Sequence, residues 1–251
     1  MGNKYQFRYS IASASEKAER QFNLQSVQPW EPRFLASPGH LLPVIADKTP
    51  NLIDLYHWGM PLSAANLMHE TIAVENILQH WKVPQRPRAV LLNLIRNRRC
   101  VVLANCFMVE RNAPQRQPVC VFLPEHRLFS MAAIWNVIPG QGYGFAILNQ
   151  PANNFLRKLD QEKMPLLLEE KEMRTWLTGK ISYSHITSLL RHVYSSAKLN
   201  AYPLHAGPWQ QQSDNAELLQ PAGPPFEEDA IQVMNEKLVP LGWGHQKGKD
   251  L

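Results

Sequence analysis

Residues 98–111 constrain the fold of this chain more than any other stretch. Two arginines open the stretch, Glu110 and Arg111 close it, and within the apolar run between them only Asn105 is strongly polar. Such a run is typical of a strand buried on both faces, or of two strand pieces bent at Asn105-Cys106. A buried helix is the alternative, but no polar stripe recurs at helical spacing. We therefore predict that these residues belong to the sheets of the core.

Other apolar runs predict further strands, and helical spacing predicts helices around them. Strands are expected at residues 41–45, 53–60, 118–123, 128–137 and 145–148. Helices are expected at residues 13–22 with a serine cap, and at 151–163, 169–177, 184–194 and 227–238, while 65–81 is expected to be a helix or a loop that enters one. The basic segment 84–88, which contains two prolines, is interpreted as a break, and residues 200–223 as irregular chain.

Size and composition place the chain among folded globular proteins. A length of 251 residues favours one large domain, and 45% hydrophobic residues allow a sizeable core. No apolar run reaches the length of about 18 residues that a membrane span needs, and the first residues lack the apolar centre of a secretion signal. The three cysteines lie in apolar runs, which indicates buried, reduced thiols in a cytoplasmic protein.

Charge and motifs say little about function on their own. The net charge of +5 favours an acidic partner such as nucleic acid, and a solvated basic surface is the alternative. There is no glycine-rich phosphate loop, no His-Glu-x-x-His, no Cys-x-x-Cys and no Gly-x-Ser-x-Gly. The nine histidines are scattered singly. Neither a metal site nor a cofactor is therefore expected.

Eight short segments, taken in their order along the chain, are more specific. They are 1–5 (MGNKY), 33–39 (RFLASPG), 58–61 (WGMP), 66–71 (NLMHET), 98–110, 129–135 (FSMAAIW), 145–148 with 163–168 and 176–177 (FAIL, KMPLLL, WL), and 215–221 (NAELLQP). Together they resemble the SRAP family, the SOS-response-associated peptidases that process abasic sites. The resemblance covers about residues 1–221.

The resemblance implies a fold and a chemistry. The fold would be α+β, with a central, mostly antiparallel, barrel-like β core, peripheral helices, an SRAP-like domain at 1–223, and a C-terminal helical extension with a tail at 224–251. In this family an N-terminal Cys captures the ring-opened aldehyde of an abasic site in single-stranded DNA as a thiazolidine. An Asn positions the site, while a Glu and a His transfer protons.

This chain departs from the family pattern at most chemical positions. The position of the nucleophile holds Gly2, while Asn66 is retained and Met68 replaces an Arg. The Glu position falls on Val109, or on Glu110 if the strand carries a one-residue bulge. The His position falls on Asp160 or Gln161, and the following Arg on Glu162 or Lys163. The candidate catalytic residues are Gly2, Asn66, Glu110 and Asp160, and the candidate DNA-binding residues are Lys4, Arg86, Arg96, Arg98, Arg99 and Lys163.

Three hypotheses follow from this pattern. The first is a degenerate SRAP-like protein of the SOS response that binds single-stranded or abasic DNA, with impaired crosslinking and peptidase chemistry. The second is a residual lyase that uses the α-amine of Gly2 to form a Schiff base. The third is a protein-interaction module that has lost DNA binding and recruits a partner through its C-terminal extension. We expect a cytoplasmic monomer, nucleoid-associated if bacterial, with no membrane partner.

Overall fold

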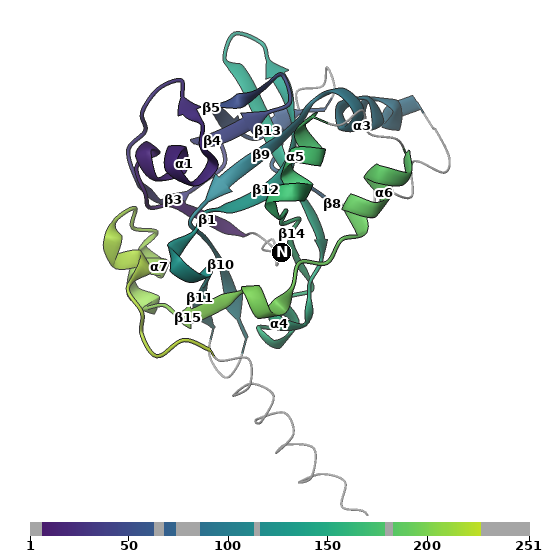
Figure 1. The fold of residues 1–251 in the computed structure, drawn as a ribbon. Coiled ribbons are helices and arrows are strands. Elements are labelled where there is room, and N and C mark those ends of the chain that lie inside the picture. Colours follow the sequence, from purple (N-terminus) through teal and green to yellow (C-terminus); the bar gives the residue numbers. More distant parts are fainter. Residues whose placement is uncertain (1–6, 63–67, 74–85, 113–115, 179–182, 227–251) are drawn as a thin grey trace, which may run out of the picture.

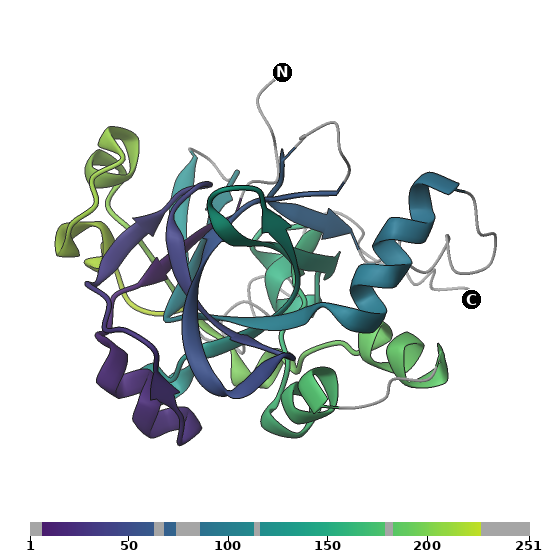
Figure 2. The same cartoon turned by 90° about the horizontal axis from the view of Figure 1, so that it is seen from above.

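Two twisted sheets curl around a shared interior and form a barrel-like core, with helices outside it (Figures 1 and 2). The structure is a computed structural model that describes residues 7–62, 68–73, 86–112, 116–178 and 183–226. Most strand pairs are antiparallel; the parallel exceptions are β2 with β5, and β13 with β5 and with β8. The prediction of an α+β fold with a mostly antiparallel, barrel-like core is therefore confirmed.

The strands divide into two large sheets and a short ribbon. The five-stranded sheet has the order β15 (Asn200–Pro203), β11 (Gln117–Phe122), β10 (Cys106–Arg111), β1 (Arg8–Ile11) and β3 (Arg33–Ala36). The larger sheet has the order β14 (Lys163–Pro165), β13 (Gly142–Pro151), β12 (Phe129–Ile138), β9 (Arg99–Ala104), β4 (Leu41–Ala46), β5 (Thr49–Trp58) and β2 (Gln25–Ser26). Strand β8 (Thr71–Ala73) pairs with β13 beside this path. The ribbon pairs β6 (Met60–Pro61) with β7 (Met68–His69).

The central stretch forms two strands that belong to different sheets. Strand β9 is buried at every residue from Arg99 to Ala104, so its continuous apolar pattern reflects burial on both faces. The chain then bends at Asn105, and β10 continues in the five-stranded sheet. The prediction of two strand pieces bent at Asn105-Cys106 is thus confirmed, and so is burial on both faces of the first piece.

Three apolar clusters explain why the barrel holds together. The interior cluster contains the inward-facing side chains of both sheets, such as Tyr9, Phe107 and Phe145. A second cluster lies between the outer face of the larger sheet and the helices α3 (Arg86–Asn97), α5 (Glu170–Thr178) and α6 (Tyr183–Arg191). A third lies between the outer face of the five-stranded sheet and the C-terminal segment with α7 (Ala206–Gln211) and η3 (Ala216–Leu219). Both sheets are therefore covered on both faces.

The remaining helices are short and lie around the core. They are α1 (Ser15–Phe22), α4 (Asn154–Lys158), η1 (Pro124–His126) and η2 (Ser196–Lys198). Helix α4 occupies only part of the expected helix 151–163, and it begins where the side chain of Asn153 accepts the N–H of Leu156. No helix in the described segments is both long and apolar enough to cross a membrane.

Several local expectations were wrong. Residues 65–81 were expected to be a helix or a loop that enters one, but Met68–His69 and Thr71–Ala73, in the part that the structure describes, are short strands. The expected break at 84–88 overlaps the start of α3, and the expected irregular segment contains β15 and α7. Helix α1 has Ala14 as its N-cap residue, with no side-chain cap. The expected helix at 227–238 lies outside the described residues.

Removal of the Phe107 side chain should test the barrel interior. Phe107 is fully buried, and its ring lies 5.9 Å from that of Phe7 and 5.4 Å from that of Phe129. Phe107→Ala should lower the free energy of unfolding by about 3–5 kcal/mol, because it leaves a cavity that the neighbours cannot fill. Urea denaturation measures this change. The control is Val27→Ala at a side chain that is 58% exposed, where the change should stay within about 0.5 kcal/mol.

Candidate functional site

The end of β10 and the loop before β14 carry the two described members of the predicted catalytic set, Glu110 and Asp160. The structure brings these segments together. The Asp160 carboxylate accepts the backbone N–H of Asn112 at 3.0 Å, and the Gln161 side-chain amide donates to the Glu110 carbonyl oxygen at 2.7 Å. Asp160 also has a left-handed backbone, with φ of +61°. In this structure the Asp160 carboxylate therefore holds the end of β10 through a backbone contact.

The Glu110 side chain points away from the barrel interior. The pairing of β10 with β11 runs from Cys106 to Arg111 without a register shift, so the bulge on which the Glu110 assignment depended is absent. Side chains alternate along a regular strand, and it is Val109 that belongs to the interior cluster. Glu110 accepts the indole N–H of Trp209 at 2.9 Å instead. The interior position of β10 is therefore apolar.

Arg99 is a structural residue, which corrects its place among the predicted DNA-binding residues. Its side chain is 5% exposed, and its guanidinium donates to the carbonyl of Trp176 at 2.5 Å, to that of Ile95 at 3.1 Å, and to that of Arg96. These carbonyls belong to the last turns of α5 and α3, where a cation is favourable. Arg99 joins two helix ends, and its burial keeps it from contacting a phosphate.

The other predicted basic residues differ in accessibility. Arg96 is exposed, and Arg98 is partly exposed and donates to the side chain of Asn136. Lys163 is partly exposed in β14. Gly2, Lys4 and Asn66 lie outside the described residues, as does the side chain of Arg86 at the start of α3.

A cationic and aromatic cluster, which we call the Trp135 cluster, was missed by the sequence analysis. The Lys48 ammonium lies 3.1 Å from the ring centroid of Tyr143, 4.9 Å from that of Trp135 and 5.4 Å from that of Tyr56. The Arg98 guanidinium lies 5.3 Å from the Trp135 ring. These five residues form the Trp135 cluster. They come from separate segments of the chain, so no local pattern in the sequence marks them.

Three buried side chains have a raised pKa: Tyr9 and Cys100 in the barrel interior, and Cys106 on the outer face of the five-stranded sheet. Tyr9 is fully buried without a hydrogen-bond partner for its hydroxyl, and burial raises its pKa. A hydrogen bond to Cys120 and burial raise the pKa of the Cys106 thiol, and burial raises that of Cys100. A raised pKa reduces the thiolate fraction, and the thiolate is the reactive form. Nor do the described residues include a group of three or more His, Cys, Asp or Glu side chains placed to hold a metal ion.

Comparison with known proteins gives the family. The model of the SOS response associated peptidase (SRAP) family matches residues 7–207, most of the chain. The chain belongs to the SRAP family. The match spans both sheets of the barrel, so the resemblance drawn from eight short segments is confirmed.

Individual relatives are distant. The chain is 22% identical over 223 residues to the abasic site processing protein YoqW of Bacillus subtilis (strain 168), covering 85% of this chain and 98% of that one. Among solved structures, a protein from Bacteroides thetaiotaomicron has a TM-score of 0.72 at 19% identity and covers 87% of this chain and 100% of that one. A phage-related protein from Bordetella bronchiseptica has a TM-score of 0.62 at 17% identity, covering 80% and 94% of the two chains. These structures share the fold.

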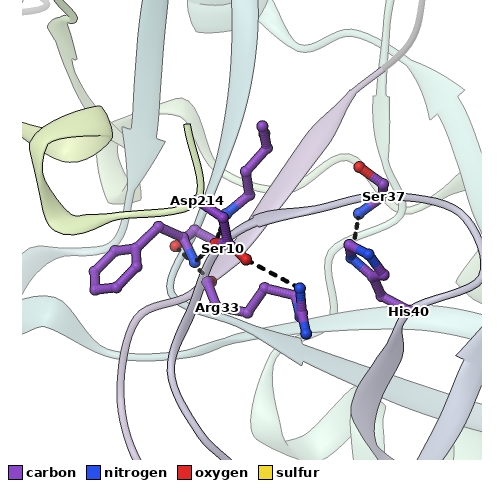
Figure 3. Close-up of polar contacts among 7 residues, drawn as sticks. Ser10, Arg33, Ser37, His40 and Asp214 are labelled. Atoms are coloured by element: carbon purple, nitrogen blue, oxygen red, sulfur yellow. Dashed lines mark hydrogen bonds and ion pairs between the residues drawn. The ribbon is translucent and has the colours of Figure 1, made fainter. Parts of the chain in front are cut away.

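Two SRAP-like segments that lie far apart in sequence hold each other in space. Asp214, beside segment 215–221, accepts the backbone N–H groups of Phe34 at 2.7 Å and Leu35 at 2.9 Å, and the Arg33 guanidinium at 2.9 Å (Figure 3). The carboxylate thereby satisfies edge-strand donors of β3. These contacts fasten Asp214, the residue before segment 215–221, to segment 33–39.

The tryptophans of the SRAP-like segments have structural roles. Each indole N–H donates a hydrogen bond: Trp58 to the Glu70 carbonyl at 3.0 Å, Trp135 to the Asp47 carboxylate at 2.9 Å, and Trp176 to the Cys100 carbonyl at 2.9 Å. All three rings are buried. The expectation that these residues pack in the core is consistent with this geometry, and the indole donors also fix neighbouring segments.

The His40 ring should make folding sensitive to mild acid. His40 Nδ1 accepts the Ser37 backbone N–H at 3.0 Å (Figure 3), which requires a neutral ring. Burial first, then Arg33, lowers the His40 pKa from its ordinary 6.5, with Asp214 acting in the opposite direction. The unfolded chain therefore binds the proton more readily than the folded chain does. The contribution of the neutral His40 ring to the free energy of unfolding is complete above pH 6.5, and it is lost as the pH falls from 6.5 through the pKa of the folded state.

The measurement is urea denaturation of the native protein and of His40→Asn between pH 7.5 and 5. The native protein should lose more stability than the variant over this window, because the variant has no ring to protonate. Parallel pH dependence of the two proteins would contradict the assignment.

Proposed function

We propose that this SRAP protein acts in the response to DNA damage by binding single-stranded DNA, including strands with abasic sites, without forming the thiazolidine crosslink. The observation that carries the proposal is the SRAP match over residues 7–207. The name of the Bacillus relative, an abasic site processing protein, supports the same substrate class.

The loss of crosslinking chemistry is supported by two positions. A thiazolidine requires sulfur and a free amine on adjacent carbons, and Gly2 supplies no sulfur. At the position where the family has its proton-transferring Glu, the interior of the barrel holds Val109, which is 3% exposed. An aliphatic side chain can neither accept nor donate a proton. Both the nucleophile and the carboxylate of the family chemistry are therefore replaced.

DNA binding is supported by the Trp135 cluster. Proteins that bind single strands combine cations, which contact phosphates, with aromatic rings, on which bases stack. Within the cluster, Lys48 is exposed and Tyr143 is 36% exposed at the hairpin between β12 and β13. Arg96, two positions before the cluster residue Arg98, is also exposed. An accessible charge, that of Lys48, therefore lies beside an accessible ring.

The charges and the ring should contribute to binding in different ways. Replacing Lys48 and Arg96 together by alanine should weaken binding of a labelled oligonucleotide and lower the slope of log affinity against log salt by about 1.4, or about 0.7 per lost phosphate contact. Tyr143→Ala should weaken binding by about 1–3 kcal/mol without changing the slope, because stacking releases no counterions.

Fluorescence anisotropy at several salt concentrations measures both effects. The matched control is Arg174→Ala on α5, where an exposed arginine pairs with Glu170 at 2.5 Å; it should change neither quantity. An affinity that is the same in the double variant and in the native protein would place the DNA elsewhere.

The native protein should form no heat-stable crosslink with abasic single-stranded DNA. Cys100, Cys106 and Cys120 are buried and lie within the chain, where their nitrogens are amides. Incubation followed by denaturing electrophoresis tests this expectation. A crosslink that disappears on mutation of one cysteine to serine would overturn it. Borohydride added to the same mixture would trap a Schiff base, the product expected if the Gly2 amine retained lyase activity.

A further inference from the structure

An apolar groove remains uncovered on the outside of the barrel. It has a volume of about 510 Å³ and lies between the end of β13, helix α4 and the segment that follows α6. Ala152, Leu190 and Tyr194 form its walls, and Val193 at its edge is 59% exposed. An exposed apolar side chain beside an apolar groove is typical of a surface that another segment covers.

The charge at the rim of this groove is positive. Arg157 and Arg191 are the only charged residues among those that line it, and both are exposed. In the part of the chain that the structure describes, neither belongs to an ion pair. An occupant that combines an apolar face with acidic residues would therefore fit.

The chain leaves the described structure close to this groove. The backbone N–H of Phe226 donates to the Ala201 carbonyl at 2.7 Å, and the Arg111 guanidinium lies 5.6 Å from the Phe226 ring centroid. Ala201 follows the groove residue Ser196 by five positions, a separation of at most about 18 Å. The chain continues for 25 residues beyond Phe226, to Leu251, so the tail can reach the groove.

We propose that residues 227–238 dock in this groove as an amphipathic helix. Ile231, Met234 and Leu238 recur at the i, i+3, i+7 spacing that forms one helical face, and Ala230 belongs to the same face. The positions opposite this face, 229, 232 and 236, are all polar, while Val233 lies at the flank and Glu227 lies one turn before Ile231 on the apolar face. From Ala230 to Leu238 the segment therefore has one mainly apolar side to bury and one mainly polar side to leave in water.

Charge matches the groove as well. The segment opens with three consecutive acidic residues, 227–229, opposite in sign to the rim of the groove. In the docked arrangement the apolar face covers Val193 and Leu190, and the acidic turn pairs with Arg191 or Arg157.

A second cavity, of about 760 Å³, fits this segment less well. It lies between α1, η1 and α5, and its charged lining residues are Glu125, Glu169, Glu170, Arg127, Arg174 and Lys198. These three acidic and three basic side chains balance, so this lining offers no net positive charge to the acidic turn of the segment. Charge therefore favours the groove beside Val193.

Disulfide trapping in the full-length protein tests the proposal. One cysteine is placed at Val193, and a second is placed in turn at each position from 231 to 238. The native cysteines are buried and should remain silent. With oxidised glutathione as oxidant, crosslinks should form about tenfold faster from positions 231, 234 and 238 than from 232, 233 and 236, because docking raises the local concentration of one helical face.

The matched control moves the first cysteine to Val27, whose side chain is 58% exposed. Equal rates from Val193→Cys and Val27→Cys would overturn the proposal, as would rates that ignore the helical pattern. Arg191→Glu should slow disulfide formation, and adding Glu228→Arg to the same protein should restore its rate. A rate that neither substitution changes would also contradict docking of the segment in this groove.

Two other occupants would be recognised in the same experiment. Rates that rise with protein concentration would indicate the tail of a second copy and overturn docking within one chain. A groove that traps no tail, but whose Arg157→Glu and Arg191→Glu variants lose oligonucleotide binding, would belong to DNA.

Discussion

The crossing of the chain from one sheet to the other at Asn105 is the constraint on which the barrel depends. The Asn105 backbone N–H donates to the Ser10 carbonyl at 2.8 Å, and its side-chain oxygen accepts the Ser13 N–H at 3.1 Å and the Ser13 hydroxyl at 2.8 Å. These bonds satisfy the polar groups that a sharp bend between two buried strands leaves exposed. They also fasten the start of the chain to the junction of the sheets. Asn105, the one strongly polar residue of the apolar run, thus supplies the hydrogen bonds that the chain needs where it passes from one sheet to the other and closes the barrel interior.

The parts of the fold that could be predicted are those in which burial alone determines the pattern. Strand β9 is covered on both faces, so its apolar run needed no knowledge of its partners. The pattern failed where distant pairing decided the structure, as at Thr71–Ala73, which extends beside β13. It failed again at α3, where Pro87 lies in the first turn and is compatible with a helix, although a proline in a basic segment was interpreted as a break.

The candidate site was harder to predict, because side-chain direction depends on register. A shift of one residue in β10 would exchange the directions of Val109 and Glu110, and the sequence alone leaves that choice open. The regular pairing with β11 decides it. Arg99 is a similar case, since an arginine at the start of an apolar strand could face solvent or join two helix ends. Only the positions of α3 and α5, which come from distant segments, show that it is buried.

The two positions that the proposed function treats as replaced, Gly2 and Val109, are linked by the cost of burial. A carboxylate at the position of Val109 would lie among apolar side chains such as Phe7 and Phe107, and an ionised group there needs partners to offset its lost hydration. In the family, the reacting groups give such a carboxylate its role. Under the proposal that Gly2 takes the place of the thiol, a carboxylate at this position would have no chemical role, and the aliphatic Val109 packs in the interior instead. The Trp135 cluster does not depend on Val109, because Lys48 and Tyr143 present their side chains at the surface. Crosslinking chemistry can therefore be lost from this barrel without altering the surface proposed to bind DNA.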